Sequence, residues 1–167
     1  MRLLPADVVG AEVRQKNRMP IQLSVITPER TVFDGVVDQV TLPTTEGEIT
    51  VLPNHLPLVS VLAPGELRLR VSGQDTPLAV AGGFIEVLPG NRIAVLADDA
   101  LRVEELDVAA IEAARERARN VLEEKRHTDD ASFADAAAAL QRELARLKVA
   151  RKYRHGGRVH SPPETGA

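Results

Sequence analysis

The sequence has no cysteine and no tryptophan, and aromatic side chains make up only 2% of its 167 residues. The absence of cysteine excludes disulfide bonds and thiolate chemistry, and it fits a reducing compartment. The few aromatic residues cannot form a platform on which nucleic-acid bases stack. No run approaches the roughly 20 apolar residues that a membrane-spanning helix needs. We therefore expect no binding of single-stranded nucleic acid and no helix that crosses a membrane.

Catalytic motifs are also missing. The chain has no glycine-rich phosphate loop, no nucleophile elbow and no helical zinc-binding pattern. His55 follows a Pro-Asn pair, where a local hydrogen bond is the commoner role. Metal binding by His155 and His160 is disfavoured, because their segment has the composition of disorder. Asp98 and Asp99 would point apart on an extended chain, so they indicate a strand-to-helix boundary. We expect no catalytic residue and no metal site.

Charge is distributed unevenly, although the formal net charge is only −3. Residues 19–100 carry 4 basic and 10 acidic side chains, whereas residues 142–158 carry 7 basic and 1 acidic. A basic end on an acidic body indicates an acidic partner surface or a phosphate-bearing ligand. The alternative is a solvated helix end, where the helix dipole favours Lys and Arg.

Strand and turn signals alternate from residue 21 to residue 97. The densest stretch is 44–67, which contains the apolar runs Ile49–Leu52 and Leu56–Leu62. Residues Glu66–Ser72 alternate between apolar and polar, as a half-buried strand does. Proline and glycine punctuate strands, so we predict turns or breaks at Asp34-Gly35, Pro64-Gly65 and Gly82-Gly83. Many short strands with turn signals between them predict an antiparallel β-sandwich.

The pattern becomes helical after residue 100. Asp107 is a good N-cap, and apolar residues then recur at helical spacing to about Arg126. A link at 127–130 precedes a second helix, whose predicted apolar stripe is Phe133, Ala137, Leu140, Leu144 and Leu147. The high alanine content favours an antiparallel hairpin. Alanine buries little apolar area, so we expect the hairpin to dock weakly and to move.

These patterns predict an α+β fold in which an N-terminal antiparallel β-sandwich is followed by a C-terminal antiparallel two-helix hairpin. We expect four segments along the chain: a disordered N-terminal extension at 1–18, the sandwich at 19–100, the hairpin at 101–153 and a disordered tail at 154–167.

Several spaced motifs carry a resemblance to a known family: Val32-Phe33-Asp34-Gly35, Glu46-Gly47-Glu48, Leu52-Pro53-Asn54-His55-Leu56-Pro57, Pro64-Gly65 and Ala81-Gly82-Gly83-Phe84. In this order, followed by an alanine-rich hairpin, they resemble the epsilon subunit of the F-type ATP synthase over residues 21–150. The resemblance implies a non-catalytic rotor subunit of the central stalk. Its sandwich would bind the gamma subunit and the membrane-embedded c-ring, so that proton-driven rotation is coupled to ATP synthesis.

The resemblance also implies which residues make contacts. The interface with the c-ring and gamma would involve two loop tips, with residues Glu46, Gly47, Glu48, Asn54 and His55. The hairpin would restrain ATP hydrolysis by extending toward the catalytic alpha and beta subunits. Its basic residues would meet an acidic loop there: Arg142, Arg146, Lys148, Arg151 and Lys152.

Some members of this family bind ATP on the folded hairpin as a regulatory ligand. The matching positions here are Ile111, Glu112 and Arg115, with Arg142 on the second helix. Glu112 stands where the motif has Asp, and Glu116 stands where it has Ala. An added negative charge beside a triphosphate is unfavourable, so the departure weakens the expectation of ATP binding. We expect no other cofactor.

The resemblance implies a peripheral membrane protein on the cytoplasmic face of the bacterial inner membrane, held there only through the complex. Two other readings remain open. A stand-alone β-sandwich enzyme would need a convergent cluster of His, Glu and Asp, which the strand pattern does not supply. A soluble adaptor whose hairpin binds a coiled coil overlaps physically with the stalk role, and co-purification with a multi-subunit ATPase separates the two.

Overall fold

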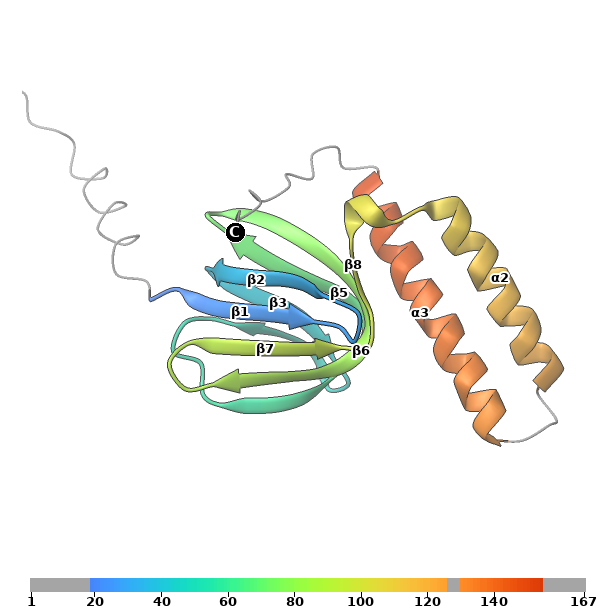
Figure 1. Ribbon diagram of the computed structural model, residues 1–167, viewed down its shortest axis with the longest axis horizontal. Coiled ribbons are helices and arrows are strands. Elements are labelled where there is room, and N and C mark those ends of the chain that lie inside the picture. Colours follow the sequence, from blue (N-terminus) through green and yellow to red (C-terminus); the bar gives the residue numbers. More distant parts are fainter. Residues whose placement is uncertain (1–18, 126–129, 155–167) are drawn as a thin grey trace, which may run out of the picture.

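The computed structural model describes residues 19–125 and 130–154, which form a β-sandwich with two helices beside it (Figure 1). The expectations for 1–18, for most of the link at 127–130 and for the tail beyond residue 154 lie outside the described residues. The strands are β1 Ile21–Ile26, β2 Thr31–Val37, β3 Gln39–Thr44, β4 Gly47–Val51, β5 Leu58–Val71, β6 Gln74–Leu88, β7 Arg92–Ala97 and β8 Ala100–Arg102. They are followed by the 3-10 helix η1 Val103–Glu105 and by the helices α2 Val108–Glu124 and α3 Asp130–Arg154.

The strands pair in the order β2-β1-β7-β6-β5-β3-β4, and β8 pairs with β6. β5 and β6 pair with each other along almost their whole lengths. The second half of β6 also pairs with β7, and the second half of β5 also pairs with β3, so the sheet folds over on itself into two layers. The predicted α+β fold is confirmed. One pairing departs from the antiparallel pattern, because β1 and β7 run parallel.

The core lies between the two layers and is built from the alternating residues of each strand. Leu67 and Leu69 of β5, which the period-two pattern assigned to the buried face, are 0% exposed. They pack in one cluster with Leu23, Ile85 and Val95 from the other strands. The alternation thus fixes which face of each strand points inward and which remains for contacts outside the sandwich.

Three of the predicted strand breaks are wrong. Asp34-Gly35 lies inside β2, Pro64-Gly65 inside β5 and Gly82-Gly83 inside β6. β5 and β6 are 14 and 15 residues long because they take part in both layers, and the proline and glycines lie where the two strands pass from one layer to the other. Gly82 and Gly83 have φ angles of 107° and 119°, which permit such a bend without ending the hydrogen-bonded pairing.

The boundary at Asp98-Asp99 is followed by a strand rather than directly by a helix. β8 pairs with β6, and η1 follows it before α2 begins. Two contacts fix this segment to β2 and its preceding turn: the Arg30 guanidinium pairs with Glu105 at 2.7 Å, and Arg102 donates to the carbonyl of Val32 at 3.2 Å. The hydrogen bond from Arg30 holds the pKa of Glu105 below its ordinary value. The sandwich therefore extends through η1, and the hairpin starts beyond it.

The predicted N-cap of the first helix is confirmed. The Asp107 carboxylate accepts hydrogen bonds from the backbone amides of Ala109 and Ala110, at 2.9 and 3.3 Å. These bonds satisfy two amides that have no partner within the helix. α2 begins at Val108 and ends at Glu124.

The predicted apolar stripe of the second helix is largely wrong. Phe133 and Leu144 are 39% and 40% exposed, and of the five predicted residues only Leu147 is buried. The other buried residues of α3 are Ala136, Ala145, Val149 and Ala150. A single stripe does not describe this helix, because α3 contacts α2 on one side and β5 and β6 on another. Figure 1 shows α3 between the sandwich and α2.

We predict that Gly83→Ala destabilises the fold more than Gly90→Ala does. A methyl group at position 83 would lie 2.1 Å from the carbonyl oxygen of Leu96, which is backbone of the paired strand β7 and cannot move aside. Gly90 also has a positive φ, of 78°, but the space around it is open. Urea denaturation should show a loss of about 3 kcal/mol at position 83 and about 1 kcal/mol at position 90. Equal losses would contradict the tight contact between β6 and β7.

Candidate functional site

The Glu46–Glu48 tip joins β3 to β4 and has a fixed backbone with exposed carboxylates. The Thr44 hydroxyl donates to the carbonyl of Gly47 at 2.7 Å and accepts from the amide of Glu46 at 3.2 Å. Gly47 has φ 121°, a conformation that side chains rarely adopt. The side chain of Glu48 is 59% exposed and is paired with Arg68 of β5 at 3.0 Å. The tip thus presents negative charge on a rigid support.

The Asn54-His55 tip lies between β4 and β5 and is held by local hydrogen bonds. The amide of Asn54 donates to the side-chain oxygen of Asn91 at 2.6 Å, and the amide of His55 donates to the carbonyl of Leu52 at 3.1 Å. The Nδ1 of His55 lies 2.7 Å from the carbonyl oxygen of Leu56. His55 therefore has the local hydrogen-bonding role that its position in the loop predicts.

The structure does not bring the two tips together. Gly47, at one end of β4, pairs with the last residue of β3, whereas Val51, at the other end, pairs near the start of β3. The Asn54-His55 tip follows Val51, so the two tips lie at opposite ends of β4. A five-residue strand spans about 16 Å, which is further than one small loop of a partner reaches.

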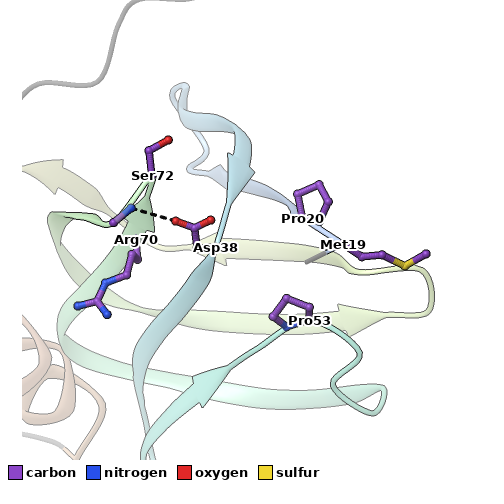
Figure 2. Close-up of a pocket in the computed structure, with 7 residues that line it drawn as sticks. Met19, Pro20, Asp38, Pro53, Arg70 and Ser72 are labelled. Carbon is purple, nitrogen blue, oxygen red and sulfur yellow. Dashed lines mark hydrogen bonds between the residues drawn. The ribbon is translucent and has the colours of Figure 1, made fainter. Parts of the chain in front are cut away.

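A shallow pocket of about 490 Å³ lies near the Asn54-His55 tip, between the start of β1 and the β5–β6 turn (Figure 2). Its two charged side chains, Asp38 and Arg70, already have partners. Asp38 accepts a hydrogen bond from the amide of Gly73 at 3.1 Å, and Arg70 binds both oxygens of Asp75 at 2.8 and 3.2 Å. The hydrogen bond from Arg70 lowers the pKa of Asp75. These groups stabilise the turn and do not point to a bound ligand.

A row of exposed apolar side chains crosses four neighbouring strands. Val61, Phe84, Leu96 and Ile26 are register partners on β5, β6, β7 and β1, so their side chains lie on one face of the sheet. They are 45%, 55%, 55% and 37% exposed. We call these four residues the apolar row. The hairpin does not cover it, because α3 lies on the side of the sandwich formed by the first half of β6 and β8 (Figure 1). Aligned apolar residues left in water mark a surface for another protein.

Two ion-pair clusters fix α3 to the sandwich. In the first, the Arg146 guanidinium pairs with Asp99, at the start of the β8 segment, and with Glu143 at 2.8 Å. Burial alone would lower the pKa of Arg146, but its bond to Asp99 and the two nearby carboxylates raise it, so the side chain stays charged. The Nε of Arg146 and the Oε2 of Glu143 are buried without a hydrogen-bond partner. An unpaired buried polar atom opposes docking, so it offsets part of the stabilisation that these ion pairs contribute.

The second cluster is centred on Glu66 of β5, whose side chain is 17% exposed. Lys152 places its ammonium 3.1 and 2.7 Å from the two carboxylate oxygens. The Tyr153 hydroxyl donates to Oε1 of Glu66 at 2.5 Å. The contact between Glu66 and Lys152, which are 86 residues apart in the sequence, thus attaches the end of α3 to β5.

The predicted basic set of the hairpin is mostly engaged within this chain. Arg146 and Lys152 bind the sandwich, and Arg151 pairs with Glu112 of α2 at 2.8 Å. Arg142 and Lys148 make no ion pair with the described residues. Arg146 and Lys152 can meet an acidic partner only when the hairpin leaves the sandwich, whereas Arg151 is paired within the hairpin itself.

The residues that match the ATP-binding motif are also placed by the structure. Ile111 is buried, Glu112 is occupied by Arg151, and Arg115 lies 4.0 Å from Glu116. Of the two arginines that would hold a triphosphate, Arg115 thus lies beside a carboxylate, that of Glu116.

Sequence reasoning missed Glu66, Asp99 and the apolar row. The uneven charge distribution was a usable signal for the first two, because a basic helix end and an acidic sandwich can pair within one chain. The apolar row had no local signal, since one residue from each of four strands becomes a row only when the register is known.

Within residues 19–125 and 130–154, no group of three or more His, Cys, Asp or Glu side chains is arranged to hold a metal ion. In the same residues, neither helix combines the length and the apolar composition that crossing a bilayer requires.

We predict that high pH releases the end of α3 from the sandwich. Burial, then the hydrogen bond to Glu66 and its charge, raise the pKa of Tyr153 well above the ordinary 10.0. The docked state excludes the ionised tyrosine, so this contribution to docking is complete below about pH 10 and is lost as pH rises through the raised pKa. Tyr153 is the only tyrosine and tryptophan is absent, so ultraviolet absorbance reports its ionisation directly.

The variant Glu66→Gln tests the cause of this shift. Without the carboxylate, tyrosinate absorbance should appear at lower pH than in the original protein, while Glu46→Gln, on a distant tip, should leave the titration unchanged. An identical titration in Glu66→Gln would contradict the contact between Glu66 and Tyr153.

Comparisons with known proteins agree with the fold of a β-sandwich followed by two helices. The family model "ATP synthase, Delta/Epsilon chain, beta-sandwich domain" matches residues 20–103. The ATP synthase epsilon chain of Herpetosiphon aurantiacus is 44% identical over 137 residues, which cover 82% of this chain and 98% of the relative. That of Syntrophobacter fumaroxidans is 46% identical over 132 residues, covering 79% and 96%.

Solved structures show the same fold. A chain in the Euglena gracilis mitochondrial ATP synthase, in an assembly of OSCP, F1 and c-ring, has a TM-score of 0.66 and 26% identity, with 81% of this chain and 82% of that chain covered. A chain in the central stalk and c-ring of the Tetrahymena thermophila mitochondrial enzyme has a TM-score of 0.51 and 20% identity, covering 78% and 96%. With a matching family model and relatives similar over nearly their whole lengths, this chain belongs to the ATP synthase delta/epsilon family, as an epsilon-type, non-catalytic subunit of the F-type enzyme.

Proposed function

We propose that the protein is a rotor subunit that couples rotation of the c-ring to ATP synthesis and restrains ATP hydrolysis through its hairpin. The observation that carries this proposal is the apolar row, because a subunit that transmits rotation needs a surface that stays bound to its neighbour. Four apolar side chains aligned across four paired strands form such a surface on the hydrogen-bonded sheet.

The gamma subunit is the partner that we assign to the apolar row. Burying apolar side chains contributes about 25 cal/mol per Å², and Phe84 at the centre of the row offers the largest area. The face around it also carries the polar side chains of Glu86 and Ser24, which would form a polar rim.

The c-ring is the partner that we assign to the Glu46–Glu48 tip. A ring of repeated loops needs a contact that is rigid and charged, since charge pairs fix register without a large buried area. The Asn54-His55 tip lies at the other end of β4, so we assign it to the gamma side of the interface and not to the same ring loop.

The hairpin is the element that we assign to the control of hydrolysis. Its docked state uses Arg146 and Lys152 to bind the sandwich, so release would expose two cations to an acidic loop of an alpha or beta subunit. Both states have charge pairs for the same side chains, which keeps the energy difference between them small. ATP as a regulatory ligand would have to displace Arg151 from Glu112.

Through the gamma subunit and the c-ring, the protein would be held as a peripheral membrane protein on the cytoplasmic face of the bacterial inner membrane.

We predict that Phe84→Glu weakens binding to the ATP synthase complex by about tenfold or more, because it places a charge at the centre of the apolar row. The control is Gln74→Glu, which adds the same charge at the exposed first residue of β6. Binding to purified enzyme depleted of this subunit measures both. Equal affinity of the two variants would remove the apolar row from the interface.

We also predict that full-length protein slows ATP hydrolysis by the depleted enzyme, whereas a version ending at Leu106 binds without slowing it. This end point keeps β8 and the pair between Arg30 and Glu105, which an end at Ala100 would remove. Equal inhibition by both versions would show that the hairpin is not the brake. If full-length protein fails to bind the complex, the rotor function itself is wrong, and the adaptor reading would replace it.

A further inference from the structure

A row of alternating charges connects the Glu46–Glu48 tip to the end of the hairpin. Glu48 pairs with Arg68 at 3.0 Å, Nε of Arg68 lies 3.7 Å from Oε1 of Glu66, and the same oxygen is 3.1 Å from the ammonium of Lys152. The side chains of Arg68 and Glu66 are 33% and 17% exposed, so the middle of the row is less screened by water than its ends. The order along the row is negative, positive, negative, positive.

We propose that this row couples the two functional ends of the protein, so that engagement of Glu48 by a cationic or hydrogen-bond-donating partner group loosens the docked hairpin. The identity of that partner as the c-ring rests on the proposed function. The coupling itself lies within this chain and can be tested without any partner.

The sign of the coupling follows from competition for Glu66. Glu48 neutralises Arg68 and holds it toward β4. When a partner takes Glu48, Arg68 is left with Glu66 as its nearest carboxylate, and it then competes with Lys152 and Tyr153 for one oxygen. Arg68 and Lys152 also repel each other when only one carboxylate lies between them. Both effects favour release of α3.

The hairpin is the two-state element that such coupling requires. Its other attachment, the pairs of Arg146 with Asp99 and Glu143, does not involve Glu66, so the Glu66 cluster is one of two charged attachments that hold α3. A small change at Glu66 therefore changes the docked fraction by a measurable factor.

Thiol labelling in the full-length chain tests the proposal. The chain has no cysteine, so a single Ala79→Cys gives an unambiguous reporter. Ala79 is 2% exposed and is the register partner of Glu66, on the face that α3 covers. Its reaction rate with a thiol reagent, divided by that of the exposed Gln74→Cys, gives the fraction of time in which the hairpin is open.

Glu48→Gln should raise the relative labelling rate of Ala79→Cys by about two- to fivefold, the range expected for an exposed ion pair. The matched control is Glu46→Gln, which removes the same charge two residues away on the same tip and should leave the rate unchanged. A second reporter, Ala97→Cys, lies in the sandwich core and labels only when the whole fold opens. Its rate should not change with either variant.

An Arg68→Gln background decides whether the effect passes along the row. Because Glu48 acts through Arg68, the increase caused by Glu48→Gln should vanish in this background. Three results would overturn the proposal: equal rates for Glu48→Gln and Glu46→Gln, an increase that persists without Arg68, or equal acceleration of the Ala79→Cys and Ala97→Cys reporters. Each of these leaves the rotor function untouched, since that is tested by binding to the enzyme.

Discussion

The pairing of β5 with β6 is the constraint on which the rest of the structure depends. The register runs from Leu58 paired with Val87 to Val71 paired with Gln74, and no other pair of strands stays together for so long. Because this ribbon bends between the two layers, its two halves present outer faces to different surroundings. In one half, Val61 and Phe84 belong to the apolar row. In the other half, Glu66 and Ala79 lie on the face that the hairpin covers. The apolar row and the surface that holds the hairpin thus lie on opposite ends of one bent ribbon.

The attachment of the hairpin combines ion pairs with the burial of mostly small apolar side chains. The buried residues of α3 are mainly alanine and valine with one leucine, and the contacts that give the docked position its specificity are those of Asp99 and Glu66 with the helix. Such pairs are weak where water reaches them and are costly where they are buried incompletely. They therefore define where the helix docks without binding it tightly. A subunit that keeps one surface bound and frees another needs this difference between strong and weak contacts.

Much of the fold could be predicted from local patterns in the sequence. The alternation of Leu67 and Leu69 with charged neighbours gave the buried face of β5, and Asp107 gave the start of α2. The errors share one cause. Proline and glycine at 64–65 and 82–83 favour turns locally, but the pairing of two long strands outweighs that preference and uses the same residues for a bend. For α3, a one-face stripe was expected, whereas packing against two partners spreads burial around the helix.

The candidate site could be predicted only in part. The Glu46–Glu48 and Asn54-His55 tips follow from turn chemistry, and the structure shows both of them exposed. That they lie at opposite ends of β4, and that Glu66 meets Lys152 across 86 residues, depends on register and on long-range packing. A single sequence contains the charges that pair but does not say which of them meet.

The attachment of β8 and η1 to the sandwich sets the geometry of any movement by the hairpin. With Glu105 held by Arg30 and Arg102 held by the carbonyl of Val32, the pivot lies at Leu106 and Asp107. α2 and α3 have 17 and 25 residues, which correspond to lever arms of about 25 and 37 Å. A rotation about this pivot would carry the far end of the hairpin over tens of ångströms while the sandwich, β8 and η1 stay in place.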